Sequence, residues 1–163
     1  MPNTIHGVKN EVIVDESLER VCPGQFNFSS NREFEYDKKQ RRYRTDRVVF
    51  NNVKDPWHNE CVAVSVKTQK TQGTVNQKIL SEIFVLCDVV KENKQKVIHG
   101  IVVFDGKDLC KEKSRDLLKY YSKKVYGASF YPEEGLGKEV TLMFKNNLDK
   151  FVKERMHNLW NKR

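Results

Sequence analysis

Residues 60–67 read ECVAVSVK, with valine at every second position from residue 62 onward. Successive side chains of an extended chain point to opposite faces of a sheet, so the valines share one face while Ser65 and Lys67 share the other. Valine is also a strong strand former. The stretch therefore predicts a strand that buries its valine face and brings Ser65 and Lys67 to one side of a sheet.

The stretches around this strand alternate between strand and helix patterns. Residues 43–51 are rich in strand formers and are separated from residues 60–67 by turn residues, which predicts a β-hairpin with Trp57 as a hydrophobic cap in its loop. A helix from Glu11 to just before Pro23 is expected ahead of the hairpin, with a loop and an edge strand over 25–40. Further along, the patterns predict a helix over 75–91, a strand over 97–105, a helix over 114–126, a strand over 139–144 and a helix over 147–160. This order predicts an α/β (α+β) fold, a mixed central sheet flanked by helices, in a single domain covering 1–163.

Length and composition are those of an ordinary globular protein. A chain of 163 residues can bury one core without disulfides or a structural metal. The four cysteines form no C-x-x-C pair and the four histidines are not spaced as zinc partners, which favours reduced cysteines over a zinc site. No apolar run reaches the roughly 18 residues of a membrane span, and no signal-peptide pattern begins the chain. We expect a soluble, intracellular protein, cytoplasmic or nuclear, with no membrane partner.

Basic residues outnumber acidic ones. The 30 Lys and Arg against 22 Asp and Glu give a net charge of +8, which favours a polyanionic partner because basic side chains that neutralise phosphates release condensed counterions. The best candidate phosphate surface is a basic cluster of six residues: Lys38, Lys39, Arg41, Arg42, Arg44 and Arg47. The alternative is a solvated edge strand whose charges prevent aggregation.

A carboxylate and a lysine on the two strands of the predicted hairpin form the candidate catalytic centre. A hairpin can bring Asp46 and Lys67 within a few ångströms of one another. The carboxylate would hold a hard divalent cation, Mg²⁺ or Mn²⁺, and the lysine would orient a water molecule, deprotonate it, or stabilise charge on a phosphate. The alternative for Asp46 is a surface ion pair with its neighbouring arginines.

The arrangement resembles the PD-(D/E)XK nuclease superfamily, in which an acidic residue is followed across a hairpin by D/E-x-K. The matching stretches are YRTD at 43–46 and AVSVK at 63–67, while KTQKTQGTVNQK at 67–78 resembles a K-x-Q-x-x-x-G-T-x-x-x-K variant. GIVVFDG at 100–106 resembles the next core strand of the family. The resemblance covers 43–106 and implies a restriction-endonuclease-like fold. It also implies that Gln69 and Lys78 assist at the centre, and Lys70 joins the candidate nucleic-acid-binding residues.

Ser65 departs from the family pattern. The family places its second acid at this position, and a serine cannot be a charged metal ligand. Glu82, on the following helix, is the candidate replacement, so the resemblance implies an Asp46–Glu82–Lys67 centre. Glu11 on the first helix is a further candidate metal ligand. The alternatives are an ordinary ion pair within the helix for Glu82 and a solvated first-turn position for Glu11.

The function that the resemblance implies is metal-dependent hydrolysis of DNA phosphodiester bonds by an endonuclease of restriction-like, homing or junction-resolving type. A homodimer or higher homo-oligomer is expected, because cutting both strands with so small a chain requires two copies, and Trp160 is a candidate dimer contact. One alternative is a catalytically inactive nucleic-acid-binding module of the same fold, which Ser65 favours. Another is a basic scaffold domain that contacts a second protein.

Overall fold

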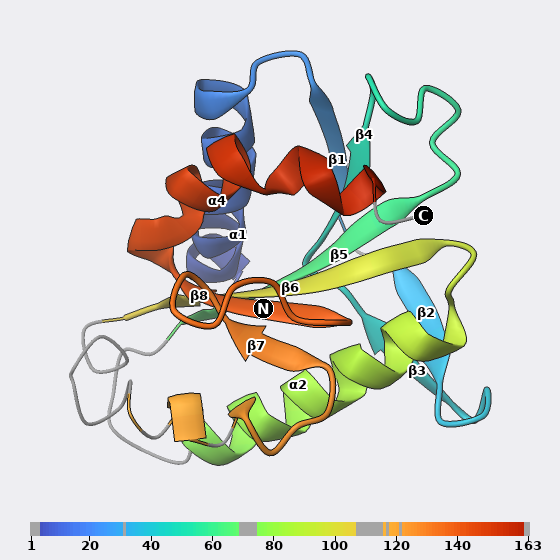
Figure 1. Ribbon diagram of the computed structural model, residues 1–163, viewed down its shortest axis with the longest axis vertical. Helices are drawn as coiled ribbons and strands as arrows, with labels where there is room; N and C mark the ends of the chain where they lie inside the picture. Colours follow the sequence, from blue (N-terminus) through green and yellow to red (C-terminus); the bar gives the residue numbers. More distant parts are fainter. Residues whose placement is uncertain are drawn as a thin grey trace.

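A mixed sheet of six strands forms the centre of the molecule (Figure 1). The computed structural model describes residues 4–30, 32–68, 75–106, 116, 118–120 and 122–161. In order across the sheet, the strands are β1 (Phe26–Ser30), β4 (Arg47–Asn51), β5 (Cys61–Thr68), β6 (Val97–Asp105), β8 (Val140–Phe144) and β7 (Ala128–Phe130). Neighbours from β1 to β5 are antiparallel, and neighbours from β5 to β7 are parallel. The expected α+β architecture, a mixed sheet flanked by helices, is confirmed.

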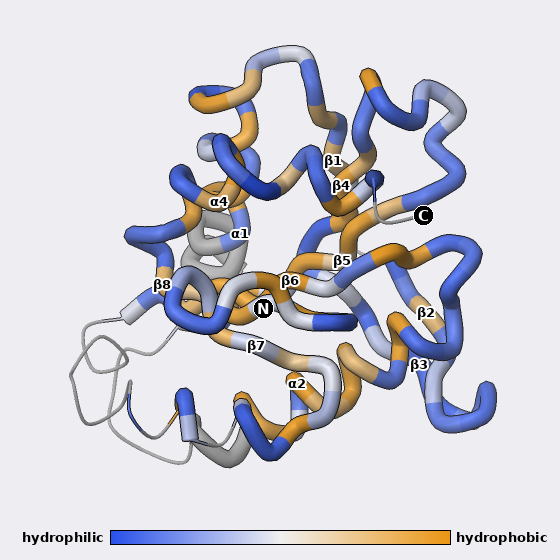
Figure 2. Tube along the Cα trace, viewed as in Figure 1, coloured by the Kyte–Doolittle hydropathy of each residue, from blue (hydrophilic) through white to orange (hydrophobic). Residues whose placement is uncertain are grey.

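Helices cover both faces of this sheet. One face is covered by α2 (Val75–Glu92), whose buried stripe consists of Ile79, Ile83, Leu86 and Val90, as the sequence predicts. The other face is covered by α1 (Thr4–Val21), α4 (Leu148–Glu154) and the 3₁₀ segment η2 (Met156–Asn161). Figure 2 shows the hydrophobic residues concentrated along the central strands between these layers. Each fully buried large apolar side chain contributes about 1.5–3 kcal/mol, so apolar packing holds both layers to the sheet.

The alternation of β5 divides the core as expected. Val62, Val64 and Val66 lie in the apolar cluster beneath α1 and α4. Cys61 and Ala63 lie in the cluster beneath α2. Positions 65 and 67 continue the second series, so their side chains emerge on the α2 side of the sheet.

Gly100 in β6 sets how closely α2 approaches the sheet. A Cβ atom built at Gly100 would lie 2.8 Å from Cγ of Leu86, closer than real side chains approach one another. The missing side chain lets the fully buried Leu86 pack directly on the β6 backbone. A larger residue at position 100 would push this part of α2 away from the sheet.

Residues 43–51 do not form the single strand that the sequence predicts. They divide into β3 (Arg41–Arg44), which pairs with β2 (Glu33–Tyr36) in a separate two-stranded sheet, and β4 in the central sheet. At the division, the backbone N–H and the side-chain hydroxyl of the buried Thr45 both donate hydrogen bonds to the carbonyl of Arg32. The chain leaves the small hairpin here, and Asp46 is the last residue before β4.

The C-terminal part of the chain also differs from the sequence-based expectation. β7 was not predicted, and the helix expected over 147–160 divides into η1 (Lys145–Asn147), α4 and η2. Most of the helix expected over 114–126 lies outside the described residues, although 118–120 are helical.

The two tryptophans occupy positions opposite to those expected. Trp57 is 82% exposed and caps nothing, whereas Trp160 is buried with its ring centroid 5.8 Å from that of Phe26. Trp160 therefore belongs to the core and is not a surface for a dimer contact. None of the described helices is long and apolar enough to cross a membrane.

Candidate active site

Asp46 lies at the junction between the two sheets. Its Oδ2 accepts a hydrogen bond of 2.7 Å from the backbone N–H of Val66 in β5, which holds the carboxylate over that strand. Burial raises the pKa of Asp46, and the nearby carboxylates of Glu11 and Glu82 raise it further. The hydrogen bond from the Val66 N–H and the charge of the Lys67 ammonium both lower this pKa. Three acids and one lysine are therefore electrostatic neighbours at this end of β5.

Glu82 reaches the same place from α2. Its Oε1 accepts hydrogen bonds from the hydroxyl of Ser65 in β5 and, at 2.7 Å, from the hydroxyl of Tyr43 in β3. Its Oε2 forms an ion pair with the ammonium of Lys67. The Glu82 side chain is 15% exposed and that of Lys67 is 32% exposed, so the pair lies at the edge of the core within reach of solvent.

Ser65 is the contact point for the carboxylate that comes from α2. The serine is fully buried, and the Glu82 carboxylate lies where the side chain of residue 65 ends. The structure thus brings Asp46, Glu82 and Lys67 together around the position of the absent second acid. The catalytic roles of these three residues remain predictions.

Tyr43 was not assigned to this centre from the sequence, where it is only the first residue of the matching stretch at 43–46. Burial, followed by the charge of Glu82, raises the pKa of its hydroxyl above the ordinary range, so the hydroxyl stays protonated and donates its hydrogen. Alternation in β3 indicates that Tyr43 points away from its basic neighbours. No sequence signal reveals that it meets a residue 39 positions later.

Glu11 is held next to Asp46 by Arg47. The Nη1 of Arg47 donates to Oε2 of Glu11 at 2.9 Å and to the carbonyl of Asp46 at 2.9 Å, while its Nε donates to Asp15 at 3.0 Å. The Arg47 side chain is only 10% exposed. Its expected place on an exposed phosphate surface is therefore corrected, because its guanidinium ties α1 to β4 inside the protein.

No family model, curated protein or solved structure matches this chain. What the site can do therefore follows from its own geometry and charges.

The donor set suits a hard divalent cation in its chemistry. Asp46, Glu82 and Glu11 supply carboxylate oxygens, the ligands that Mg²⁺ prefers. Burial is the main cause of the raised pKa of Asp46, and the charges of Glu11 and Glu82 add to it. In the part of the chain that the structure describes, no three His, Cys, Asp or Glu side chains form a ready-made metal cluster. The Lys67 ammonium instead balances the charge of Glu82. Binding a cation here therefore requires Glu82 to exchange its lysine partner for the metal.

The other five members of the basic cluster lie on the β2–β3 hairpin and are exposed. Two of them face acids on the same hairpin. Arg42 approaches Glu33 at 3.8 Å, and Arg41 approaches Asp37 at 3.7 Å. The remaining members are Lys38, Lys39 and Arg44. The positive charge of this hairpin is partly neutralised, which makes it a weaker phosphate surface than the sequence predicts.

The hairpin turn is anchored to the C-terminal half of α2 by its backbone. The N–H of Asp37 donates to Asp88 at 2.8 Å, and the N–H of Lys38 donates to Glu92 at 2.6 Å. Positive φ angles at Asp37, Lys38 and Lys39 turn these amides toward the helix. Together with the Tyr43 hydroxyl, these bonds fix the hairpin along α2.

Three predicted site residues lie outside the part of the protein that the structure describes. Gln69 and Lys70 lie outside the described residues, and Lys78 lies in α2 at a position whose side chain is not described.

Proposed function

We propose that this protein is a metal-dependent endonuclease that hydrolyses phosphodiester bonds in DNA. The observation that carries the proposal is the meeting of Glu82, Ser65 and Lys67, with Asp46 beside them. A buried serine, a lysine and a carboxylate from a different element converge on the position where a second acid is expected. The net charge of +8 favours a polyanionic substrate.

In this proposal Asp46 and Glu82 would hold Mg²⁺ or Mn²⁺. Such an ion, when bound, lowers the pKa of a water molecule and neutralises charge on the scissile phosphate. Tyr43 and Ser65 would orient Glu82 through its Oε1. Lys67 would leave Glu82 and turn its ammonium to the phosphate, where it stabilises the developing negative charge. Hydrolysis adds water across a P–O bond, so one DNA end keeps the phosphate and the leaving oxygen of the other takes up a proton.

Cleavage of both strands would involve two copies of the chain. One centre of this kind attacks one phosphodiester, and a two-fold axis would present a second centre to the opposite strand. Homodimer formation on DNA therefore belongs to the same proposal.

The test is nicking of supercoiled plasmid with Mg²⁺ or Mn²⁺, compared with EDTA. Asp46→Asn, Glu82→Gln and Lys67→Met should each lower the nicking rate at least about 100-fold, the scale of losing one electrostatic contributor to the transition state. Glu19→Gln, which removes an exposed acid from α1, is the matched control and should nick as the unmodified protein does. If the three variants nick at the unmodified rate, the activity comes from another site or another protein.

A second candidate function is a catalytically inactive nucleic-acid-binding module. The observation that favours it is the Lys67–Glu82 ion pair, which already neutralises the carboxylate needed by a metal. Plasmid binding in a gel-shift assay without nicking under any metal would support this function and overturn the endonuclease.

A further inference from the structure

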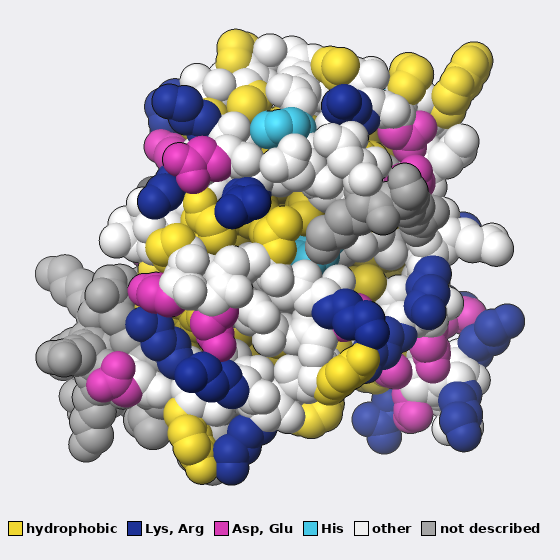
Figure 3. All heavy atoms as spheres, viewed as in Figure 1, with side chains coloured by type: hydrophobic (Ala, Val, Ile, Leu, Met, Phe, Trp, Pro, Cys, Tyr) yellow, Lys and Arg dark blue, Asp and Glu magenta, His cyan; other side chains and the backbone are white. Residues whose placement is uncertain are grey.

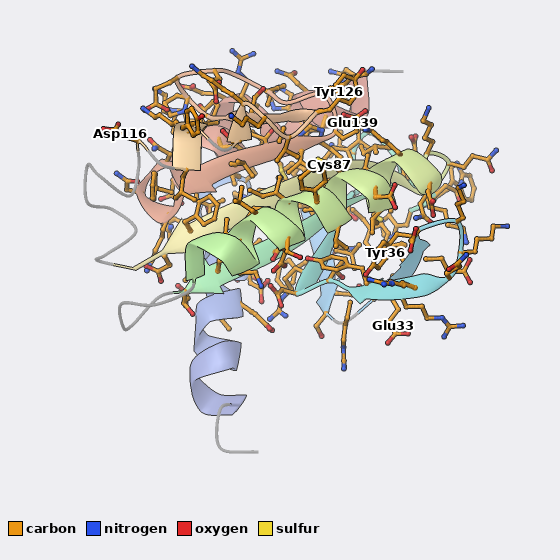
Figure 4. The ribbon with its side chains drawn as sticks, turned by 90° about the horizontal axis from the view of Figure 1, so that it is seen from below. Glu33, Tyr36, Cys87, Asp116, Tyr126 and Glu139 are labelled. Atoms are coloured by element: carbon orange, nitrogen blue, oxygen red, sulfur yellow. The ribbon has the colours of Figure 1, made fainter. Side chains whose placement is uncertain are left out.

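A groove lined by aromatic and basic side chains runs along the solvent-facing side of α2. Phe84 is 61% exposed and Tyr126 is 65% exposed, although large apolar side chains are normally withdrawn from water. Both residues line a cavity of about 410 Å³, together with Tyr36 of the β2–β3 hairpin. Figure 4 shows Tyr36 and Tyr126 on opposite sides of α2, with Cys87 between them.

A second cavity continues this groove. It has a volume of about 620 Å³ and shares Tyr126 and Lys91 with the first cavity. Its additional basic residues are Lys94 and Lys138. We refer to the two cavities together as the α2 groove.

Lysines surround the exposed tyrosine of the α2 groove. The Nζ of Lys91 lies 4.4 Å from the centre of the Tyr126 ring, and the Nζ of Lys138 lies 5.0 Å from it. Lys138 also donates a hydrogen bond of 2.8 Å to the Tyr126 hydroxyl. Figure 3 shows Lys and Arg side chains beside hydrophobic ones over α2 and near β7.

Basic residues outnumber acidic ones in the lining of the α2 groove. The basic residues are Arg41, Lys91, Lys94 and Lys138. The acids are Asp37, which pairs with Arg41, Asp88, which accepts a hydrogen bond from the Asp37 N–H, and the buried Glu139. The lining therefore carries a small net positive charge. A polyanion complements this surface better than a second copy of the chain, which would bring the same lysines into opposition.

We propose that the α2 groove binds single-stranded nucleic acid. Unpaired bases expose flat faces that stack on aromatic rings, and lysines between the rings neutralise the phosphates, a combination that binds single strands with little sequence preference. A duplex hides its base faces inside the helix, so it would gain only the phosphate contacts. A base that stacks on Tyr126 would displace one lysine from the ring and leave it beside a phosphate.

Binding is measured in EDTA by fluorescence anisotropy, with a fluorescein-labelled 20-nucleotide deoxythymidine oligomer and a duplex of the same length. We expect Tyr126→Ala and Phe84→Ala each to weaken binding of the single strand about ten-fold, the scale of losing one stacked base. Tyr126→Phe should keep the affinity because it keeps the ring. Trp57→Ala, which removes an exposed aromatic residue outside the groove, should bind as the unmodified protein does.

Salt dependence tests the lysines separately. Replacing Lys91 and Lys138 together by Gln should reduce the slope of log affinity against log salt by about 1.4, at about 0.7 per phosphate contact on a single strand. Both lysines lie at the surface of the groove, and circular dichroism verifies that the variants are folded.

Three results would overturn the proposal. The first is that the unmodified protein does not bind the single strand, or that Tyr126→Ala and Phe84→Ala bind it as tightly as the unmodified protein does. The second is an equal loss of duplex binding in these variants, because stacking is then not involved. The third is a dimer in sedimentation analysis that becomes a monomer on Tyr126→Ala, because the groove is then an interface between two copies. If the protein nicks plasmid but fails these binding tests, only the proposal for the groove is overturned. If it binds the oligomer without nicking plasmid, only the endonuclease proposal is overturned.

Discussion

The hydroxyl of Ser65 in β5 donates a hydrogen bond to the carboxylate of Glu82 in α2. The two residues are 17 positions apart, one in the central sheet and the other in the helix that covers it. The contact lets a serine take part in an acidic centre without carrying a charge, because it orients a carboxylate supplied by its neighbour. It also makes residues 65 and 82 energetically dependent on one another.

An aspartate at position 65 should destabilise the protein while Glu82 is present. Ser65→Asp places two carboxylates against each other at the edge of the core, and we expect the free energy of unfolding to fall by about 1–3 kcal/mol. The double variant Ser65→Asp with Glu82→Gln should recover much of this loss, giving a coupling energy of about 1 kcal/mol or more in urea denaturation. Pairing Ser65→Asp with Glu92→Gln, on the same helix, should recover none. Simple additivity in the first pair would mean that the two side chains do not meet.

Removing only the hydroxyl of Tyr43 should loosen Glu82. Tyr43→Phe keeps the ring and deletes a hydrogen bond to a charged group, which contributes about 1.5–3 kcal/mol. Urea denaturation measures the loss, and Tyr36→Phe on the same face of the hairpin is the matched control. Equal stability of Tyr43→Phe and Tyr36→Phe would argue against the Tyr43–Glu82 bond.

Arg47 should be the most sensitive residue of the basic cluster. Arg47→Ala leaves Glu11 and Asp15 without their buried partner and should lower the free energy of unfolding by about 3–5 kcal/mol. Arg44→Ala removes an exposed arginine from the hairpin and should cost less than about 1 kcal/mol. Chemical denaturation measures the free energy of unfolding of both variants. Similar losses in the two variants would contradict the buried role of Arg47.

Asp46 should make stability fall as the pH rises. Its folded-state pKa lies above the ordinary value of 3.8, so the folded protein binds the proton more tightly than the unfolded chain does. The contribution of Asp46 is therefore most favourable below pH 3.8 and is lost as the pH rises through the folded-state pKa. Asp46→Asn keeps an oxygen for the Val66 N–H and removes the titration.

The pH effect is measured as the stability difference between Asp46→Asn and the unmodified protein in EDTA. The variant should gain stability relative to the unmodified protein from pH 3.8 toward neutrality. Asp149→Asn is a useful contrast, because hydrogen bonds from Ser17 and Arg20 lower the pKa of Asp149 and reverse the expected sign. A constant difference for Asp46→Asn across the range would show that Asp46 titrates equally in both states.

The amino-acid sequence determined the elements whose pattern is local. The alternating valines of β5 and the stripe from Ile79 to Val90 in α2 each report which side of one element is buried, and both were predicted. The same local reasoning joined β3 and β4 into one strand, because nothing in residues 43–51 marks the change of sheet. That change depends on the bonds from Thr45 to Arg32, which only the folded chain forms.

The composition of the candidate site was decided at the tertiary level. Sequence spacing placed Asp46 and Lys67 on neighbouring strands, but the position of Glu82 depends on how α2 crosses the sheet, and that crossing relies on the space left by Gly100. The same packing made Tyr43 a partner of Glu82 and withdrew Arg47 from solvent to hold Glu11. Periodicity specifies which face of an element turns inward, whereas packing between elements specifies which residues meet there. For this protein the sequence by itself determined the faces, and the tertiary structure decided the partners.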